Sequence, residues 1–355
     1  MADPFKKRVV FVGGETAGPL MPLLAIAENW KHTNAGMVSI FVDVKKSVAA
    51  HVVPKEGFVF KPIIADKLRR YVAARNILSP LFIFVGFIQA LFLLAKLRPV
   101  LVMGAGGYVQ FPVVLAAWLL RIPSVVHQQD VHVTLSNKLC APFATKITTT
   151  FEKSVKDFSQ GLGFGNDFSK LQKVVWVGNP ARGHIASSDK TEAQSFFKLD
   201  PAWPTLLVLG GGSGAAGLNE VIVQNLNALT SVVQIIHSTG QGKEIPVKHP
   251  RYHQYSFIDR MDLAYAAADI VMARGGIGTI TELSQLKKLA IIVPMPDSHQ
   301  EANAELLFTH KAAIILDERE IQSELLTKVI RKLLFDSELQ KHMQANIRKV
   351  IPADA

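Results

Sequence analysis

The stretch that decides the fold is Asp269–Glu282, which reads DIVMARGGIGTITE. An apolar strand, Ile270–Met272, runs into a loop with three glycines in four residues, and Thr279 then opens a helix. Glycine lets a backbone approach a ligand closely and adopt positive φ. The start of a helix presents unpaired N–H groups and a partial positive charge, so this corner suits a phosphate group. Glu282 lies about one turn into the helix, where a carboxylate reaches a sugar hydroxyl beside that phosphate.

Three other glycine-rich corners follow predicted strands in the same way. They begin at Gly13, Gly104 and Gly210, and each precedes a stretch with helical spacing. Any one of them alone could be an ordinary turn between a strand and a helix, because such motifs recur by chance. Four such glycine-rich corners in one chain favour a common function, which is binding of a phosphate-bearing ligand.

Short apolar runs alternate with helical spacing along the whole chain, which is typical of doubly wound parallel sheets. We predict strands at Arg8–Val12, Val38–Val42, Val100–Met103, Ser124–His127, Lys146–Thr149, Val174–Val177, Thr205–Leu209, Val232–His237, Ile270–Met272, Ile291–Val293 and Ala313–Leu316. The sequence therefore predicts an α/β protein with two Rossmann-like domains, residues 1–183 and 190–337, facing across a cleft with the glycine loops at the carboxyl ends of the strands. We expect a last helix, about 338–355, to pack back on the first domain.

The composition is typical of a globular protein with a large apolar core, and the net charge indicates an anionic partner. Its 355 residues allow two ordinary domains, and 49% are hydrophobic while 19% are charged. The net charge of +10 favours a nucleotide or a phospholipid surface. Nucleic acid is disfavoured, because no basic stripe interleaved with aromatic residues is found. The single Cys140 excludes an internal disulfide framework and suits a reducing cytoplasm, and the short N-terminus predicts no secretory signal.

The most apolar segment of the chain is Leu81–Leu97, which reads LFIFVGFIQALFLLAKL. Its length approaches the roughly 20 residues that a membrane span requires. A span fits poorly between strands that share one sheet, so we favour a helix that packs partly on the sheet and partly against a bilayer. The alternative is a plain core helix. Nearby basic residues, Lys67, Arg69, Arg70 and Arg75, suit anionic headgroups.

Taken together, these loops resemble glycosyltransferase family 28, and within it the membrane-associated bacterial N-acetylglucosaminyltransferases with the GT-B fold. The likeness covers nearly the whole chain, with the motifs in the family's order. It implies an inverting transfer of N-acetylglucosamine from UDP-GlcNAc to lipid I, a polyprenyl-diphosphate-linked acceptor, which gives lipid II for peptidoglycan. It also implies a peripheral enzyme on the cytoplasmic face of the bacterial cell membrane, without a cofactor.

In the second half, Arg274–Glu282 is similar to the family's Arg-(Ser/Ala)-Gly-Ala-x-Thr-x-x-Glu. The resemblance implies that backbone near Gly278 and Thr279 holds the donor diphosphate and that Glu282 binds the ribose. It assigns Ile258 to the uracil and the polar pair His299 and Gln300 to the sugar hydroxyls. The complete implied donor set is Gly212, Ser213, Ile258, Arg274, Gly278, Thr279, Glu282, His299 and Gln300.

In the first half, Gly104–Val109 resembles the family's Gly-Met-Gly-Gly-Tyr loop. Gly178–Arg182 resembles Gly-Asn-Pro-Val-Arg, whose arginine is implicated in handling the diphosphate, and a planar guanidinium suits that anion. The basic residues and apolar helix near 67–97 fall where the family carries its membrane-facing patch. The implied acceptor or diphosphate set is Gly14, Thr16, Gly18, Gly106, Gly107, Tyr108 and Arg182.

Three departures from the family pattern affect the catalytic and acceptor-facing loops. Pro19 stands where the family has a histidine proposed to act near the reacting centre, and it cannot transfer a proton. Asp130 replaces an amide, and the hydroxyl of the Gly210–Ala215 loop has moved by one position. We expect Asp130, or as second candidate Glu15, to be the general base, because a carboxylate can accept the proton.

The leaving UDP also needs stabilisation, and no Asp-x-Asp pair stands at a predicted strand end to carry Mg²⁺. That role therefore falls to helix N-termini and backbone N–H groups. We expect His127 to orient its loop or to be buried. Two alternatives stay open: a UDP-sugar-binding protein without transfer activity, marked by Pro19, or a related transferase with another lipid acceptor such as diacylglycerol.

Overall fold

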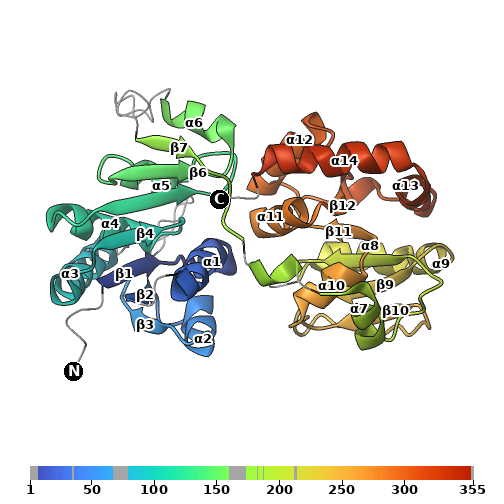
Figure 1. The fold of residues 1–355 in the computed structure, drawn as a ribbon, viewed down its shortest axis with the longest axis horizontal. Helices are drawn as coiled ribbons and strands as arrows, with labels where there is room; N and C mark the ends of the chain where they lie inside the picture. The colour runs from blue at the N-terminus through green and yellow to red at the C-terminus, as the bar shows by residue number, and fades with distance from the viewer. Residues whose placement is uncertain are drawn as a thin grey trace. The chain divides into compact units, whose positions relative to one another are not determined.

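The computed structural model describes residues 7–33, 36–66, 79–159, 173–181, 183–186, 188–211 and 214–352 (Figure 1). The chain divides into two compact units, with the boundary between Arg182 and Gly183. Each unit contains one parallel sheet with helices packed on it. The predicted fold class, two doubly wound α/β domains, is therefore confirmed.

The first unit is built on a sheet of seven strands within its described residues, in the order β3-β2-β1-β4-β5-β6-β7. The strands are β1 (Lys7–Val12), β2 (Met37–Asp43), β3 (Val59–Pro62), β4 (Leu101–Gly104), β5 (Ser124–Gln128), β6 (Lys146–Thr149) and β7 (Val174–Trp176). The helices are α1 (Ala17–Thr33), α2 (Val48–Lys55), α3 (Ser79–Leu97), α4 (Gln110–Leu119), α5 (Leu135–Cys140) and α6 (Glu152–Ser159). The strand order reverses between β1 and β4, where open α/β sheets bind ligands at the carboxyl ends of the strands.

The sheet of the first unit is covered on both faces, so the last four residues of β1, Val9–Val12, are all apolar and buried. Val10 and Val12 belong to the core formed with α3 and α4. Val9 and Phe11 point to the opposite face and belong to the core formed with α1 and α2. Successive side chains of a strand point to opposite faces, which is why a strand buried twice reads as one continuous apolar run.

The second unit repeats this plan with six strands within its described residues, in the order β10-β9-β8-β11-β12-β13. The strands are β8 (Thr205–Leu209), β9 (Gln234–Ser238), β10 (Tyr252–Tyr255), β11 (Ile270–Ala273), β12 (Leu289–Ile292) and β13 (Ile314–Ile315). The helices are η2 (Gly183–Ala186), α7 (Lys190–Phe197), α8 (Ala216–Gln224), α9 (Leu226–Thr230), α10 (Met261–Ala267), α11 (Ile277–Leu286), α12 (His299–Thr309), η3 (Glu318–Glu320), α13 (Ser323–Phe335) and α14 (Ser337–Val350). Its strand order reverses between β8 and β11.

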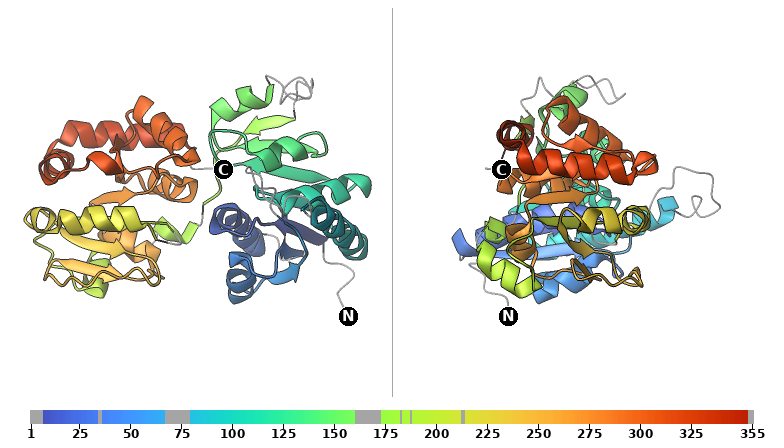
Figure 2. Two further views of the ribbon diagram at one scale, coloured as in Figure 1. Left: turned by 180° about the vertical axis from the view of Figure 1, so that it is seen from behind. Right: turned by 90° about the vertical axis from the view of Figure 1, so that its right-hand side faces the viewer.

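The last helix, α14, packs within the second unit, beside α11, α12 and α13 (Figure 2). Met343 and Ile347 are buried there, and the Ser284 hydroxyl of α11 lies 3.1 Å and 2.8 Å from the carbonyl oxygens of Ile347 and Ile351. The sequence prediction places the last helix, about 338–355, on the first domain, whereas the described part of this helix buries its apolar face on the second unit.

Two strands and one helix start differ from the sequence prediction. Strands β3 and β10 were not predicted, because both lie at sheet edges and carry few apolar residues. Helix α11 begins at Ile277, two residues before the predicted Thr279. Helix α1 begins at Ala17, so Pro19 is its third residue. A proline is tolerated there because N–H groups in the first turn have no partner within the helix.

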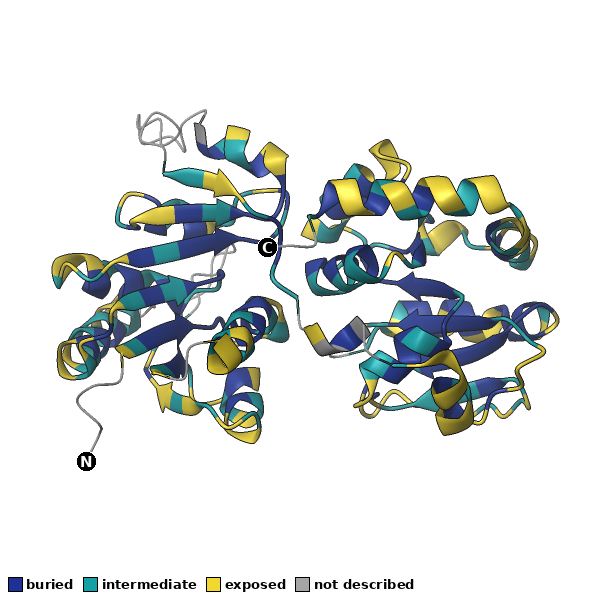
Figure 3. Cartoon of the chain, viewed as in Figure 1, coloured by how far each residue is buried: buried dark blue, intermediate teal, exposed yellow. Residues whose placement is uncertain are grey.

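Helix α3 is buried along one narrow stripe (Figure 3). Gly86, Ala90 and Leu94, spaced by four residues, form that stripe, and a Cβ on Gly86 would collide with the Ile64 carbonyl. Among the described residues, one segment, Pro80–Leu97, is long and apolar enough by length and composition to cross a membrane, and 17% of it is buried. The stripe ties α3 to the sheet, so the helix is an integral part of the first unit with an uncovered apolar side.

Candidate functional site

Two helices of the second unit begin side by side at the carboxyl edge of its sheet. Helices α8 and α11 follow β8 and β11, which are neighbours and so lie about 5 Å apart. Their N-cap residues, Ala215 and Gly276, make no side-chain hydrogen bond to the first turn. By contrast, the N-cap of α12 is Ser298, whose hydroxyl accepts from Gln300 N–H at 3.2 Å. Two adjacent uncapped helix starts are suited to a diphosphate.

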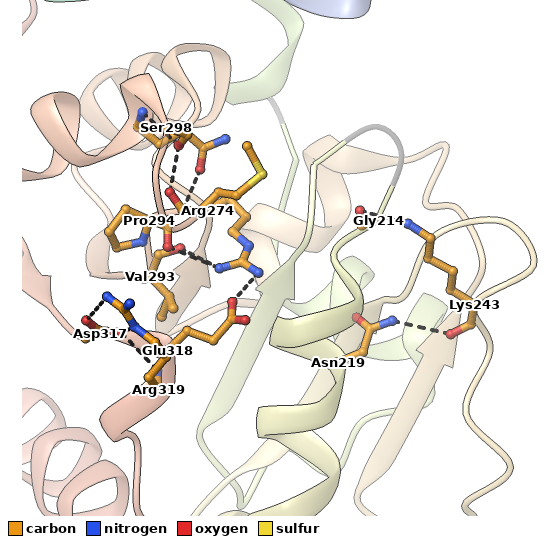
Figure 4. A network of polar contacts seen from close by, with 12 residues as sticks. Gly214, Asn219, Lys243, Arg274, Val293, Pro294, Ser298, Asp317, Glu318 and Arg319 are labelled. Atoms are coloured by element: carbon orange, nitrogen blue, oxygen red, sulfur yellow. Dashed lines mark hydrogen bonds and ion pairs between the residues drawn. The ribbon is translucent and has the colours of Figure 1, made fainter.

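The loop between β8 and α8 is packed tightly against the loop that follows β9. Gly214 has φ of 70°, and a Cβ there would lie 2.7 Å from the Cα of Gly240. Lys243 donates from Nζ to the Gly214 carbonyl at 3.2 Å, which ties the two loops together (Figure 4). The predicted donor residues Gly212 and Ser213 lie outside the described residues.

Arg274, predicted as a donor-binding residue, has a buried side chain that contacts three parts of the second unit. Its guanidinium donates to the carbonyl oxygens of Val293 and Pro294 at 3.2 Å and 3.3 Å, and it forms an ion pair with Glu318 (Figure 4). Arg274 thus joins the end of β11 to the loop after β12 and to η3. The hydrogen bonds of Arg274 to Val293 and Pro294 hold the loop after β12 in place.

The start of α12 lies against the glycine loop that precedes α11. A Cβ on Gly275 would lie 2.9 Å from the Gln300 carbonyl, and Asn303 donates from Nδ2 to the Gly275 carbonyl at 3.1 Å. The side chain of Gln300 accepts from Met295 N–H at 3.1 Å, while His299 is exposed. The structure therefore brings the predicted sugar-reading pair next to the predicted diphosphate loop.

One face of α11 gathers the remaining predicted donor residues. Gly278, Thr279 and Glu282 are partly exposed, and their spacing places them on one side of the helix. Tyr265, a fully buried residue of α10, donates its hydroxyl to Glu282 Oε2 at 2.6 Å. Sequence reasoning missed Tyr265, because a tyrosine in an apolar helix looks like a core residue. Ile258, the predicted uracil contact, is buried just before α10.

In the first unit, a buried carboxylate organises the loop between β1 and α1. Asp43 is fully buried and accepts from the N–H of Glu15 at 3.1 Å and the N–H of Val44 at 2.7 Å. Burial raises the pKa of Asp43, and the hydrogen bonds oppose that shift. Glu15 has φ of 71°, and a Cβ on Gly13 would lie 2.5 Å from Asp43 Oδ2. Asp43 was not predicted as a site residue, because in the sequence it only ends an apolar strand.

Two residues predicted for separate roles, Glu15 and Tyr108, lie together in this unit. Burial raises the pKa of Tyr108, as do the nearby carboxylates of Glu15 and Asp43 and the hydrogen bond with Glu15. Thr16, on the same loop as Glu15, is exposed, and so is Gly18 in the first turn of α1. A phenol and a carboxylate therefore share one site at the carboxyl edge of the first sheet.

The glycine loop between β4 and α4 is held by buried polar side chains. Gly106 donates from its N–H to Gln110 Oε1 at 2.6 Å, and Gln110 donates from Nε2 to Asn137 Oδ1 at 2.8 Å. Ser136 donates its hydroxyl to the Gly107 carbonyl at 2.6 Å. Helices α4 and α5 thus position the loop that was predicted to face the acceptor.

The end of β5 contains a buried histidine, and the loop after this strand contains an accessible aspartate. His127 is buried, and its ring nitrogens lie 2.9 Å from Thr148 Oγ1 and 2.9 Å from Asn179 Oδ1. Desolvation lowers the pKa of His127 to about 4, so the ring is neutral at pH 7. The prediction that it is buried is confirmed. Asp130 is partly exposed and lies two strands from Glu15, roughly 10 Å along the sheet edge.

The remaining residues predicted from the sequence lie outside the described residues. They are Arg182, predicted to handle the diphosphate, and the basic residues Lys67, Arg69, Arg70 and Arg75, predicted to meet headgroups. Within the described residues, the candidate site of the second unit is therefore the donor edge of its sheet, and the candidate site of the first unit is formed by its glycine, tyrosine and carboxylate loops.

Two parallel-sheet units, each with glycine loops at its carboxyl edge, define the class of protein as a GT-B glycosyltransferase. The chain matches the family model for the glycosyltransferase family 28 N-terminal domain over residues 9–149 and the model for the C-terminal domain over residues 205–353. Its full-length relatives, described next, agree with both matches. The chain belongs to glycosyltransferase family 28 and is a hexosyltransferase.

Relatives match over nearly the whole chain. A protein of Halothermothrix orenii, named UDP-N-acetylglucosamine–N-acetylmuramyl-(pentapeptide) pyrophosphoryl-undecaprenol N-acetylglucosamine transferase, is 32% identical over 97% of this chain and 94% of its own length. A protein of the same name from Salinibacter ruber is 31% identical over 98% of this chain and 93% of its own length.

Solved structures share the fold. The crystal structure of Acinetobacter baumannii MurG matches with a TM-score of 0.71 and 23% identity, covering 98% of this chain and 96% of that one. A putative UDP-N-acetylglucosamine 2-epimerase from Listeria monocytogenes matches with a TM-score of 0.70 and 11% identity, covering 98% and 93%. These likenesses confirm the two-domain GT-B architecture.

Proposed function

We propose that the protein transfers N-acetylglucosamine from UDP-GlcNAc to N-acetylmuramyl-(pentapeptide) pyrophosphoryl-undecaprenol, or lipid I, with inversion at the anomeric carbon. The product is lipid II, a precursor of peptidoglycan. The observation that carries this proposal is the match of both halves of the chain to full-length relatives named for this transfer. The geometry of the two glycine-loop edges supports it.

The donor binds at the edge of the second sheet. The uncapped starts of α8 and α11 hold the diphosphate, and Glu282 accepts hydrogen bonds from the ribose hydroxyls. As the bond to the sugar breaks, negative charge grows on the leaving UDP. Backbone N–H groups that already point at this charge stabilise it without reorganisation, which is electrostatic preorganisation. Ile258 contacts the uracil, and His299 and Gln300 bind the sugar hydroxyls.

A carboxylate of the first unit takes the proton from the attacking acceptor hydroxyl. Asp130 is the first candidate, because it stands on the loop after β5 and is partly exposed. Glu15 is the second, with its hydrogen bond to Tyr108 and its loop held by Asp43. Either residue would replace the proton acceptor that Pro19 cannot provide.

The exposed side of α3 rests on the anionic cytoplasmic surface of the cell membrane and brings the enzyme to its lipid-linked acceptor. Phe84 and Phe92 on α3 are 59% and 71% exposed, and Trp118 and Leu119 at the end of α4 are also exposed. Helices α3 and α4 pack together, so the exposed apolar side chains belong to two neighbouring helices of the first unit. Apolar contact and the net charge of +10 support peripheral binding.

The test is transfer of labelled N-acetylglucosamine from UDP-GlcNAc to a lipid I analogue in detergent, with UDP binding measured on the same sample. We expect turnover and binding. A parallel reaction with diacylglycerol tests the other acceptor class. Binding of UDP without turnover on either lipid would favour the non-catalytic alternative that Pro19 suggests. Absence of both binding and turnover in folded protein would overturn the donor site itself.

A further inference from the structure

The hydroxyl of a buried tyrosine, Tyr265, contacts the proposed ribose-binding carboxylate of Glu282 from the buried side of α11. Tyr265 is 0% exposed, and its hydroxyl donates to Glu282 Oε2 at 2.6 Å. We infer that Tyr265 is a positioning residue, which holds the Glu282 carboxylate toward the ribose hydroxyls and thereby gives the donor site its preference for a ribonucleotide. This inference rests on the proposed function, because it assumes that Glu282 meets the ribose.

The location of Glu282 makes its orientation important. It shares one face of α11 with Gly278 and Thr279, which lie in the first turn next to the uncapped helix start. A diphosphate at that start places the attached ribose beside the next turn of the helix, where Glu282 lies. A carboxylate there contributes to affinity only if its oxygens point at the hydroxyls.

A glutamate side chain has three rotatable bonds, and a ligand that must order it loses affinity to conformational entropy. The hydrogen bond from Tyr265 removes part of that freedom before the ligand arrives. It engages one oxygen, Oε2, from the buried side of the helix. A carboxylate accepts several hydrogen bonds, so acceptor capacity remains for the ribose.

Tyr265 is suited to this role because its hydroxyl remains a donor. Burial and the neighbouring Glu282 carboxylate raise the pKa of Tyr265 well above its ordinary value. The phenol therefore keeps its proton across the working pH range. A short hydrogen bond from a phenol to a charged carboxylate is stronger and more directional than one between neutral groups.

The helix that carries Tyr265 is firmly anchored. Leu263 and Ala264 of α10 are buried, and α10 packs on α7 and β8. Helix α10 also begins three residues after Ile258, the proposed uracil contact. The residue proposed to contact the base thus lies close in the chain to the helix that holds Glu282 in place, and a rigid support is what precise recognition requires.

The competing explanation is that Tyr265 is a core residue whose hydroxyl simply uses the nearest acceptor. The test compares dissociation constants for UDP and 2′,3′-dideoxy-UDP, measured by calorimetry on the full chain. We expect Tyr265→Phe to weaken UDP by roughly tenfold and to leave dideoxy-UDP within about twofold, since the dideoxy ligand has no hydroxyl for Glu282. A purely structural role would change both constants by the same factor.

Tyr252→Phe is the matched control. Tyr252 is another buried tyrosine of the same unit, and its hydroxyl lies 2.9 Å from Nδ1 of the buried His237. Loss of that hydroxyl should change neither dissociation constant. Equal effects of the two substitutions on the UDP preference would overturn the inference.

Glu282→Ala, at a partly exposed position, is the second variant. It should remove the preference for UDP over dideoxy-UDP, and adding Tyr265→Phe should then have no further effect. A preference that survives in Glu282→Ala would overturn the inference, as would an equal loss from Tyr265→Phe in both backgrounds. If the unchanged protein binds dideoxy-UDP as tightly as UDP, the inference fails while the proposed transfer stands. If it binds neither, the proposed function fails as well.

Discussion

Gly14 and Gly107 lie with their backbones in contact, so that a Cβ added to Gly14 would lie 2.6 Å from the Cα of Gly107. The two glycines follow β1 and β4, the neighbouring strands between which the order of the first sheet reverses. No side chain fits between the two loops. The edge of the first unit that we propose for the acceptor is therefore one continuous backbone surface, and its shape depends on both glycines.

Gly107→Ala should disrupt this edge. Gly107 has φ of 83° and touches Gly14, so a methyl group adds a collision to backbone strain. We expect the first unit to lose about 2 kcal/mol or more of its unfolding free energy and transfer to fall sharply, with UDP affinity kept. Gly106→Ala is the control, since Gly106 has φ of 105° and open space around it. Urea unfolding would contradict the prediction if both variants lost the same stability.

Gly276→Asp should separate stability from donor binding. Gly276 is the N-cap of α11, with φ of −74°, and a Cβ there meets nothing within 4 Å. An aspartate fits and caps the helix, so we expect stability to stay equal or rise by a few tenths of a kcal/mol. Its carboxylate occupies the N–H groups that the diphosphate needs, and UDP should bind at least about tenfold more weakly. Gly276→Ala should bind UDP normally, and normal binding by Gly276→Asp would rule out α11 as the phosphate site.

Substituting the two candidate bases should identify which one accepts the proton. Whichever of the two residues is the base, its substitution, Asp130→Asn or Glu15→Gln, should lower kcat at least about 100-fold while leaving UDP affinity unchanged. The other substitution should change kcat by only a few-fold. The measurement is turnover of the lipid I analogue with saturating UDP-GlcNAc. Full turnover in both variants would remove both carboxylates from the mechanism.

Two buried histidines should make the protein sensitive to mild acid. Desolvation lowers the pKa of His127 and of His237 from 6.5 to about 4. Between those values the unfolded chain binds a proton that the folded chain does not, so stability should fall as the pH drops from 6.5 to 4. The loss is up to roughly 3 kcal/mol for each histidine, and it is absent above pH 6.5.

The second unit gives the clearer test of this acid sensitivity. In the first unit the raised pKa of Asp43 acts in the opposite direction, since its folded form takes up a proton more readily. His237→Gln keeps hydrogen-bonding groups near Asn219 and Tyr252 without titrating. Urea unfolding at several pH values should show a weaker pH dependence of the second unit in this variant. An unchanged dependence would show that other groups cause it.

Phe92→Asp should weaken membrane binding without affecting the fold. Phe92 is 71% exposed on α3, so its replacement should change stability by no more than about 0.5 kcal/mol. A charge there opposes burial in the interface, and binding to phosphatidylglycerol vesicles should drop severalfold. Phe335→Asp is the matched control, because Phe335 is 78% exposed on α13 of the second unit. Equal loss in both variants would argue against α3 as the membrane-facing element.

Local sequence patterns were sufficient for much of the fold and for part of the site. The apolar runs at Val9–Val12 and Leu206–Leu209 are continuous because a parallel strand is buried on both faces, and that is a local property. Glycine loops after such strands predicted the phosphate corner at Gly275–Gly278. The edge strand Tyr252–Tyr255 was missed, because it is only partly buried and its polar residues carry no apolar pattern.

What the sequence by itself determined is therefore the alternation of strands and helices, the two domains and the order of the motifs. Only the tertiary structure decided the pairings: Tyr265 with Glu282, Arg274 with Glu318, and Gly14 with Gly107. It also decided that α14 packs on the second unit. A periodic pattern shows that a side chain is buried, but its partner depends on strand order and register, which bring together residues distant along the chain.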